Sequence, residues 1–406
     1  MTTQEKVDVI EKFFYDNYIG TPIGDALEDL EDMGTCIPVQ TIRIKDNKID
    51  YLVIGDGTCN LAYLMTLIWT KGKCNNGSNF KSPITIAHCL NTYYRLEEAA
   101  FKVFKDNWYV CQYGLEPGFF VRDDIIQGNA KSSFKMLITP TDEDPCHSSF
   151  VSQDQVWNLN PILAQLTKEG NDAARIIGLD INNYIAKNGY TVYNPYLSKL
   201  MHFHTYCPTF NEDKVAPWNR QEDRAINYKP TVKVKRGANN WYYSGGTKAA
   251  VKFFSTISPT GGLKFNSLRE VIYKGIIFVL DRIYEPVFRA FTGSDFKHNS
   301  YYCYAATSGI WYNSKFKRRF INKFNKSIKT AGTGEPFEWN IAPFIVGSSN
   351  TVNVSDLYNY LIPLIDNWYN IANDFNNGKL ANGVYPNPIS MLVLWYMYCG
   401  LIEGKL

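Results

Sequence analysis

Two polar stretches supply the side chains of this sequence that are best suited to acid–base chemistry. Arg122, Asp123 and Asp124 interrupt the otherwise apolar run of residues 118–126, and Asp154 follows in the polar segment 152–155. Hydrolysis of a glycosidic bond needs one carboxylic acid to protonate the leaving oxygen and one carboxylate to attack the anomeric carbon or activate water. Asp124 and Asp154 are therefore our candidate catalytic pair, with Asp123 as a further candidate.

The neighbours of Asp124 would shift its pKa in opposite directions. A pocket lined by Phe119, Phe120 and Ile125 would raise the pKa by desolvation, whereas the Arg122 guanidinium would lower the pKa of a nearby carboxyl group. Arg122 is also a candidate for substrate binding. The alternative interpretation is an ordinary Arg–Asp ion pair that closes a loop.

The segment that contains Asp154 has the pattern of a helix start. Ser152 and Gln155 form a Ser-x-x-Gln capping box, and Asp154 would lie in the first turn, where the helix dipole stabilises a carboxylate. Pro161 should bend this helix or mark its true first turn. An apolar stripe then follows at helical spacing, formed by Val156, Leu159, Leu163 and Leu166. A well-capped helix explains these residues equally well without any catalytic role.

Two closely spaced histidines offer a different chemistry. His202 and His204 stand next to Tyr206, and this group could act as general acid and base in the β-elimination of uronic acid polymers. Zinc sites usually place two histidines four residues apart on a helix or add a third ligand at suitable spacing, and no such partner is evident. We therefore expect no metal and no other cofactor, and ordinary half-buried histidines remain an alternative.

Several aromatic and amide side chains are candidates for substrate binding. Trp218, Trp241 and Tyr242 fall in or beside a long connection near residues 207–240, which is rich in Pro, Asn and charged residues. Aromatic residues there have less reason to be core than those inside helices, and sugar rings stack on such side chains. Gln155 and Trp157 would join them from the helix start. Packing against the protein core is the competing explanation.

The periodicity of apolar residues predicts a mainly α-helical chain. We expect helices over residues 5–18, 61–69, 84–104, 156–167, 171–188, 196–204, 247–254, 267–291, 301–328, 354–375 and 389–402. Alternating residues predict a β-hairpin near 41–54 and a short strand within 227–237. No composition break divides the chain, so we predict a single helical domain over residues 1–406 with a long loop insertion near 207–240.

The helical pattern and the polar helix start resemble the (α/α) toroid proteins of the glycan-degrading kind. Residues 271–280 and 391–398 are apolar nearly all round, as inner helices are. The start at Ser152–Gln155, preceded by Phe120–Asp124, is similar to the way in which such toroids deliver polar residues into a central cleft. The resemblance implies a toroid-like helical barrel and a cleft that processes or binds polysaccharide.

Two other functions fit the same sequence. One is a non-catalytic structural or adaptor protein of a phage virion, whose partners would be other virion proteins. The abundance of Asn and the 28 Tyr residues is typical of AT-rich genomes such as those of many phages. The other is a polysaccharide lyase that uses the histidine and tyrosine chemistry above.

Composition excludes several classes of protein. The 42 basic and 39 acidic residues are interspersed, so we do not expect nucleic acid as the main partner. The sequence has no run of about eighteen uninterrupted apolar residues, so we expect no membrane partner. Nine cysteines are scattered singly, which favours a reducing compartment. We predict synthesis in the cytosol without a signal peptide, with the virion as an alternative destination. Walker, dinucleotide-binding and nucleophile-elbow motifs do not occur.

A strongly basic segment stands out near the C-terminal third. Residues 315–326 form a basic amphipathic helix in which Phe316, Phe320 and Phe324 recur every four residues. The simplest interpretation is a solvated basic face over an apolar stripe. The alternative is a contact with an anionic glycan, a nucleic acid or an acidic partner.

Overall fold

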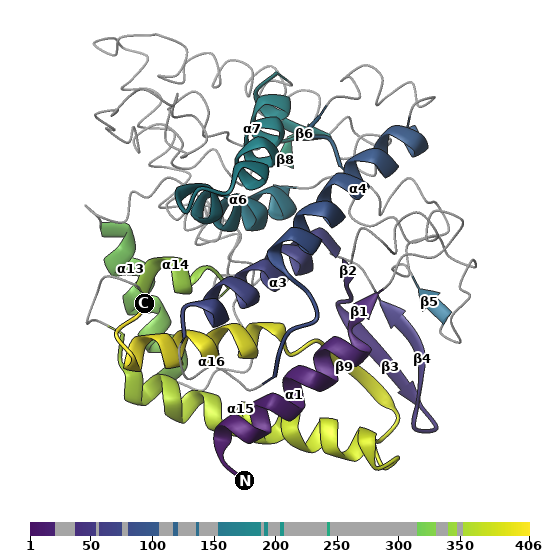
Figure 1. Cartoon of the computed structure of the whole chain (residues 1–406), viewed down its shortest axis with the longest axis vertical. Coiled ribbons are helices and arrows are strands. Elements are labelled where there is room, and N and C mark those ends of the chain that lie inside the picture. Colours follow the sequence, from purple (N-terminus) through teal and green to yellow (C-terminus); the bar gives the residue numbers. More distant parts are fainter. Residues whose placement is uncertain are drawn as a thin grey trace. The chain divides into compact units, whose positions relative to one another are not determined.

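The computed structural model describes residues 1–20, 37–53, 57–74, 80–104, 117–120, 135–137, 153–187, 191–193, 204–206, 242–243, 315–329, 340–346 and 352–406. These residues are mainly helical, with small sheets (Figure 1). The chain forms two compact units. Unit 1 comprises Met1–Lys102, Phe120–Ser149 and Ser314–Leu406, and unit 2 comprises Val103–Phe119 and Phe150–Asn313.

Unit 1 is built from helices of the two ends of the chain. They are α1 (Thr3–Asn17), α3 (Gly57–Gly72), α4 (Ile86–Phe104, nearly all in this unit), α13 (Lys315–Lys329), α14 (Pro343–Val346), α15 (Val354–Asn376) and α16 (Ile389–Ile402). Helix α1 packs along α15, and α16 contacts α1, α3, α14 and α15. Segments far apart in sequence therefore share one core. No helix among the described residues is long and apolar enough to cross a membrane.

Helix α16 lies at the centre of this core. Every residue from Met391 to Met397 is buried. A helix with apolar residues on all sides cannot present a polar face to water, so it has to be surrounded by other elements. Helix α16 meets this requirement by packing against four neighbouring helices. The sequence pattern predicted both its bounds and its burial.

Helix α1 shows how local sequence fixes an element at the edge of the core. The Thr2 hydroxyl accepts a hydrogen bond from the Glu5 backbone N–H at 3.2 Å, and the Thr2 N–H donates to the Glu5 carboxylate at 2.6 Å. This reciprocal capping box satisfies two N–H groups at the helix start. Val7, Ile10 and Phe14 then bury one face of the helix completely.

A four-stranded sheet completes unit 1, in the order β5-β4-β3-β9. Strands β3 (Thr41–Lys45) and β4 (Lys48–Val53) form the predicted hairpin, and Asp46 and Asn47 make its turn with positive φ. Strand β9 (Gly383–Pro386) pairs antiparallel with β3, and β5 (Lys135–Leu137) pairs parallel with β4. A separate pair joins β1 (Ile19–Gly20) to β2 (Ile37–Pro38). The sheet thus ties the C-terminal region to the N-terminal one.

Unit 2 contains a helix pair and a small sheet. Helices α6 (Gln153–Lys168) and α7 (Asp172–Lys187) pack against each other. Strands β6 (Thr191–Tyr193), β7 (His204–Tyr206) and β8 (Tyr242–Tyr243) form an antiparallel sheet in that order. The helix predicted over residues 196–204 is wrong at its end, because His204 pairs in β7. The loop insertion near 207–240 and the strand within 227–237 lie outside the described residues.

Pro161 lies inside α6, which excludes one of the two predicted outcomes, that it marks the first turn of this helix. Proline fits the φ angle of a helix and costs one backbone hydrogen bond together with a steric contact to the preceding turn. The helix continues through this residue with buried neighbours on both sides, Asn160 and Ile162. Burial of the surrounding turns therefore outweighs the local preference of proline.

A close backbone contact joins residues 117–119 to α7. Gly118 has φ +93°, and a Cβ at this position would overlap the backbone carbonyl of Asp180. The neighbouring Phe119 ring lies 5.5 Å from the Tyr184 ring, centroid to centroid. Only glycine allows both the left-handed backbone and this approach.

We expect Gly118→Ala to destabilise unit 2 by about 2–3 kcal/mol, because it adds steric overlap to backbone strain. Gly170→Ala is the matched control: Gly170 has φ +90°, but no atom lies within 4 Å of a Cβ built there. This control should cost about 1 kcal/mol from strain alone. Urea unfolding, combined with hydrogen exchange of α7 peptides, would measure both. Equal losses would show that the approach to Asp180 carries no penalty.

Candidate functional site

The first turns of α6 hold three of the residues that the sequence singles out. The helix begins at Gln153, so Asp154 is its second residue and Gln155 and Trp157 follow within the first turns. Ser152, the predicted cap, lies outside the described residues. Because the helix starts where the capping pattern places it, Asp154 lies where the N-terminal dipole favours a carboxylate.

The same part of α6 contains buried polar side chains. Gln155, Asn158 and Asn160 are all buried, with at most 4% of any of them exposed, alongside the apolar Val156 and Leu159. Carboxamide groups in a protein interior need hydrogen-bond partners, so they tend to fix the elements around them. The start of α6 is therefore a buried segment that contains three polar side chains.

Helix α7 adds a carboxyl group that the sequence analysis missed. Asp180 is half-buried, and this burial raises the pKa of its carboxyl group above the usual value. It lies on the helix that packs against α6, and its backbone carbonyl faces Gly118. The signal was present in the sequence, because Asp180 is the one acidic residue in the apolar run of residues 176–181.

The small sheet places two further candidates on neighbouring strands. His204 lies in β7 and Tyr242 in β8, and the register pairs Thr205 with Tyr242 and His204 with Tyr243. Residues far apart in the sequence are thus on neighbouring strands. His204 lies in an extended strand, in which successive residues alternate between the two faces of the sheet.

The remaining candidates lie outside the described part of the chain. They are Arg122, Asp123, Asp124, His202, Trp218 and Trp241. The structure describes only the backbone of four other candidates, Asp154, Trp157, His204 and Tyr242. The predicted roles of these residues therefore stay predictions, and the described helix pair α6–α7 is the part of the site that can be argued from geometry.

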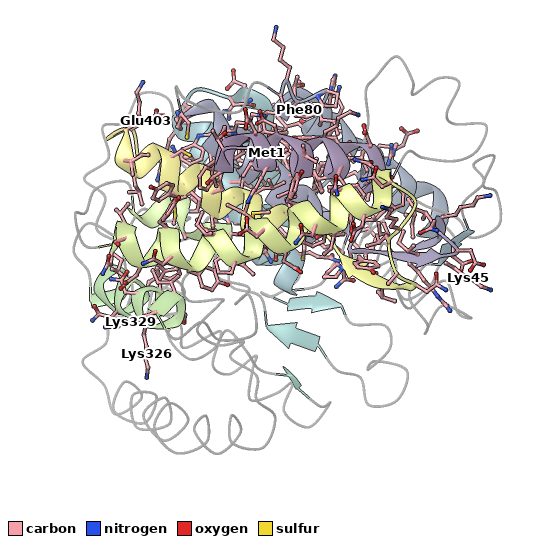
Figure 2. The ribbon with its side chains drawn as sticks, turned by 90° about the horizontal axis from the view of Figure 1, so that it is seen from below. Met1, Lys45, Phe80, Lys326, Lys329 and Glu403 are labelled. Atoms are coloured by element: carbon pink, nitrogen blue, oxygen red, sulfur yellow. The ribbon has the colours of Figure 1, made fainter. Side chains whose placement is uncertain are left out.

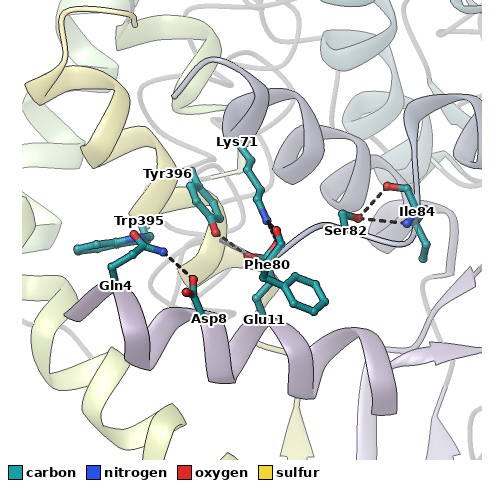
Figure 3. Close-up of polar contacts among 9 residues, drawn as sticks. All are labelled: Gln4, Asp8, Glu11, Lys71, Phe80, Ser82, Ile84, Trp395 and Tyr396. Atoms are coloured by element: carbon teal, nitrogen blue, oxygen red, sulfur yellow. Dashed lines mark hydrogen bonds and ion pairs between the residues drawn. The ribbon is translucent and has the colours of Figure 1, made fainter. Parts of the chain in front are cut away.

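Unit 1 contains a second group of ionisable side chains that are in contact with one another, which the sequence analysis also missed. Glu11 of α1 is fully buried. Its Oε1 lies 2.7 Å from the Lys71 ammonium of α3, and its Oε2 accepts a hydrogen bond of 2.5 Å from the Tyr396 hydroxyl of α16 (Figure 3). Lys71 also donates to the backbone carbonyl of Phe80 at 2.7 Å. One carboxylate thus joins three helices.

This cluster holds the core together and does not offer an open catalytic site. Both oxygens of Glu11 are engaged, and the carboxylate has no contact with solvent through which a substrate could reach it. The Lys71 ammonium lies 5.4 Å from the ring centroids of both Phe80 and Tyr396, which provides cation–π attraction in place of water. The sequence signal is that Glu11 occupies an apolar position of the stripe formed with Val7, Ile10 and Phe14.

Two cysteines near this core should make the fold sensitive to alkaline pH. Burial, with a smaller contribution from the Glu403 carboxylate, raises the pKa of the Cys74 thiol from 9.0 to about 11. Burial, with smaller contributions from Cys74 and Glu403, raises the pKa of the Cys399 thiol to about 12. Above the unfolded pKa the unfolded chain releases these protons while the folded chain keeps them. The free energy of unfolding therefore falls as pH rises through this range.

We expect urea-unfolding midpoints to decline from about pH 9 upward. A Cys399→Ala variant should show a shallower decline, because its unfolded state has one thiol fewer to ionise. An unchanged dependence on pH in this variant would contradict the assignment to Cys399.

Comparisons with protein-family models, with curated proteins and with solved structures found no match for this chain. Within the described ranges, no group of three or more His, Cys, Asp or Glu side chains could hold a metal ion. The chemistry of the candidate site therefore has to be inferred from α6, α7 and the sequence around them.

Proposed function

We propose that the chain is a polysaccharide-processing protein, a glycoside hydrolase that acts through paired carboxyl groups. The observation that carries the proposal is the pairing of α6 and α7 within unit 2. Asp154 stands in the first turn of α6, and Asp180 stands on α7 with a pKa raised by burial. Acid-assisted glycosidic cleavage requires one carboxyl group that is protonated and a second one that is ionised.

The two environments suggest a division of roles. A carboxyl group with a raised pKa stays protonated at higher pH, so Asp180 is the general acid that protonates the leaving oxygen. The helix dipole favours the ionised form of Asp154, which then serves as nucleophile or as the base that activates water. Asp124 and Asp123, which follow the Gly118–Phe120 segment closely in sequence, are the alternative partners for Asp154.

Two features support an (α/α) toroid as the scaffold. Residues 158–164 of α6 and residues 391–397 of α16 are buried, as the residues of inner helices of a toroid are. In such a scaffold the ends of inner helices face a central cleft. The buried amides of α6 would hold the start of this helix, and aromatic residues such as Tyr242, Trp218 and Trp241 would stack against sugar rings.

Sugar release from a panel of bacterial and plant glycans tests the proposal. We expect the wild-type chain to release sugar from at least one glycan, and Asp154→Asn to abolish most of that release. Asp124→Asn would show whether the loop carboxylate takes part. Asp172→Asn is the matched control, because Asp172 is an exposed carboxylate on α7. Unchanged release in Asp154→Asn would overturn the assignment.

The same panel distinguishes the competing functions. A polysaccharide lyase would cleave by β-elimination and leave an unsaturated, ultraviolet-absorbing sugar, and its activity would depend on His204 instead of Asp154. Absence of sugar release from every glycan would favour a non-catalytic virion protein. Each outcome therefore selects one of the three functions.

A further inference from the structure

Helix α13 concentrates positive charge on unit 1. It contains no acidic residue and seven basic ones, namely Lys315, Lys317, Arg318, Arg319, Lys323, Lys326 and Lys329. The chain as a whole carries a net charge of only +3. The charge of α13 is therefore a local feature and not a general property of the protein.

The two sides of α13 differ sharply. Phe320, Ile321, Phe324 and Ile328 are buried, at most 4% exposed, and the helix packs against α15. Lys326 and Lys329 are exposed on the other side, and Figure 2 shows Lys326 extending away from the ribbon. By helical spacing, four further basic positions fall on this outer side, which we call the basic face: Lys315, Arg318, Arg319 and Lys323.

The buried side excludes one common role of basic amphipathic helices. Helices that lie on membranes insert their apolar side chains between lipids. In α13 these side chains are already packed in unit 1, and the Asn353 backbone N–H donates to the Asn325 side chain at 3.2 Å, which fastens α13 to the start of α15. A partner can therefore contact only the basic face of α13, and the protein has to recognise that partner by its charge.

The basic face requires an anionic partner, and the proposed function makes that partner a polysaccharide. Five of the seven basic residues are lysines, whose ammonium groups act as compact point charges. Single-stranded nucleic acid usually also stacks its bases on aromatic rings, and two of the three phenylalanines of α13, Phe320 and Phe324, are buried.

We propose that the basic face of α13 binds an anionic polysaccharide that carries carboxylates, such as a polymer of uronic acids. This inference rests on the proposed function and names its substrate class. Lysines spaced along a helix suit it, because carboxylates recur along such a chain and point charges tolerate variation in sugar geometry. Helix α13 thus supplies a binding surface for the polymer on unit 1.

Binding of polygalacturonate, a neutral galactan and single-stranded DNA tests the proposal. We expect the wild-type chain to bind polygalacturonate, with an affinity that falls as salt is added, and to bind the galactan weakly. The double variant Lys326→Gln, Lys329→Gln should lose about two- to thirty-fold in affinity for polygalacturonate. Lys45→Gln, Lys48→Gln removes two exposed lysines of the β3–β4 hairpin and should leave the affinity unchanged.

Three results would overturn the proposal: equal losses in the two double variants, tighter binding of DNA than of polygalacturonate, or no binding of polygalacturonate at low salt. Failure of the proposed function is separable, because Asp154→Asn should retain full affinity for polygalacturonate. If binding persists while no glycan is cleaved, the basic face is a glycan-binding surface on a non-catalytic protein.

Discussion

Replacement of Glu11 by alanine is expected to lower the free energy of unfolding of unit 1 by about 3–5 kcal/mol. The substitution removes the carboxylate oxygen that lies 2.7 Å from the Lys71 ammonium, a side chain that is only 15% exposed. It also removes the acceptor of the buried Tyr396 hydroxyl. An uncompensated charge in a core is one of the few ways in which a single substitution has so large an effect.

The exposed ion pair on the same helix gives the matched control. Lys12 and Asp16 pair at 2.5 Å with more than half of each side chain exposed, and Asp16→Ala should cost less than about 1 kcal/mol. Glu11→Leu combined with Lys71→Met should recover much of the stability, because no charge then remains in the core. Hydrogen exchange of α1, α3 and α16 peptides would localise the loss. Equal effects of Glu11→Ala and Asp16→Ala would show that the buried cluster contributes little.

Elements with strong local signals were predictable from sequence. Helix α16 has the predicted bounds, because an apolar run between Pro388 and Gly404 leaves a helix few other ways to begin and end. The β3–β4 hairpin follows from alternating residues around a turn whose Asp46 and Asn47 tolerate positive φ. Both cases depend on residues that are close together in sequence.

Elements that depend on distant partners were not predictable. Strand β9 consists of four residues and ends in Pro386, and it becomes a strand only because β3, far away in the sequence, supplies its hydrogen bonds. Strands β7 and β8 depend on each other in the same way. Tertiary pairing thus decides the conformation where local preference is weak.

The candidate site shows the same limit. The start of α6 at Gln153 could be recognised from the capping pattern, which is local. Asp180 stands out in the sequence only as one acidic residue in an apolar run, and its proposed role as the partner of Asp154 depends on the packing of α7 against α6 and on the burial that raises its pKa. Glu11 was overlooked because a glutamate in a charged helix resembles a surface residue until Lys71 and Tyr396 are placed beside it.

Under the proposed function, replacement of Asp180 by asparagine is expected to slow polysaccharide cleavage about 10²–10⁴-fold, the usual contribution of a general acid. Asparagine keeps the size of the side chain but cannot donate a proton. The rate of the wild-type chain should fall as pH rises through the elevated pKa of Asp180, because the protonated form is lost there. In Asp180→Asn this alkaline limb should disappear. Asp172→Asn, on the exposed side of α7, should leave both rate and pH profile unchanged.

The leaving group separates an acid role of Asp180 from a structural one. An aryl glycoside whose phenol leaves readily needs little protonation, so Asp180→Asn should cleave it at close to the wild-type rate while losing activity on polysaccharide. Asp154→Asn should lose both activities, because the nucleophile or base is needed whatever leaves. Equal loss on both substrates in Asp180→Asn would mean that Asp180 supports the fold of α7 against α6 and that the acid must be sought in Asp123 or Asp124.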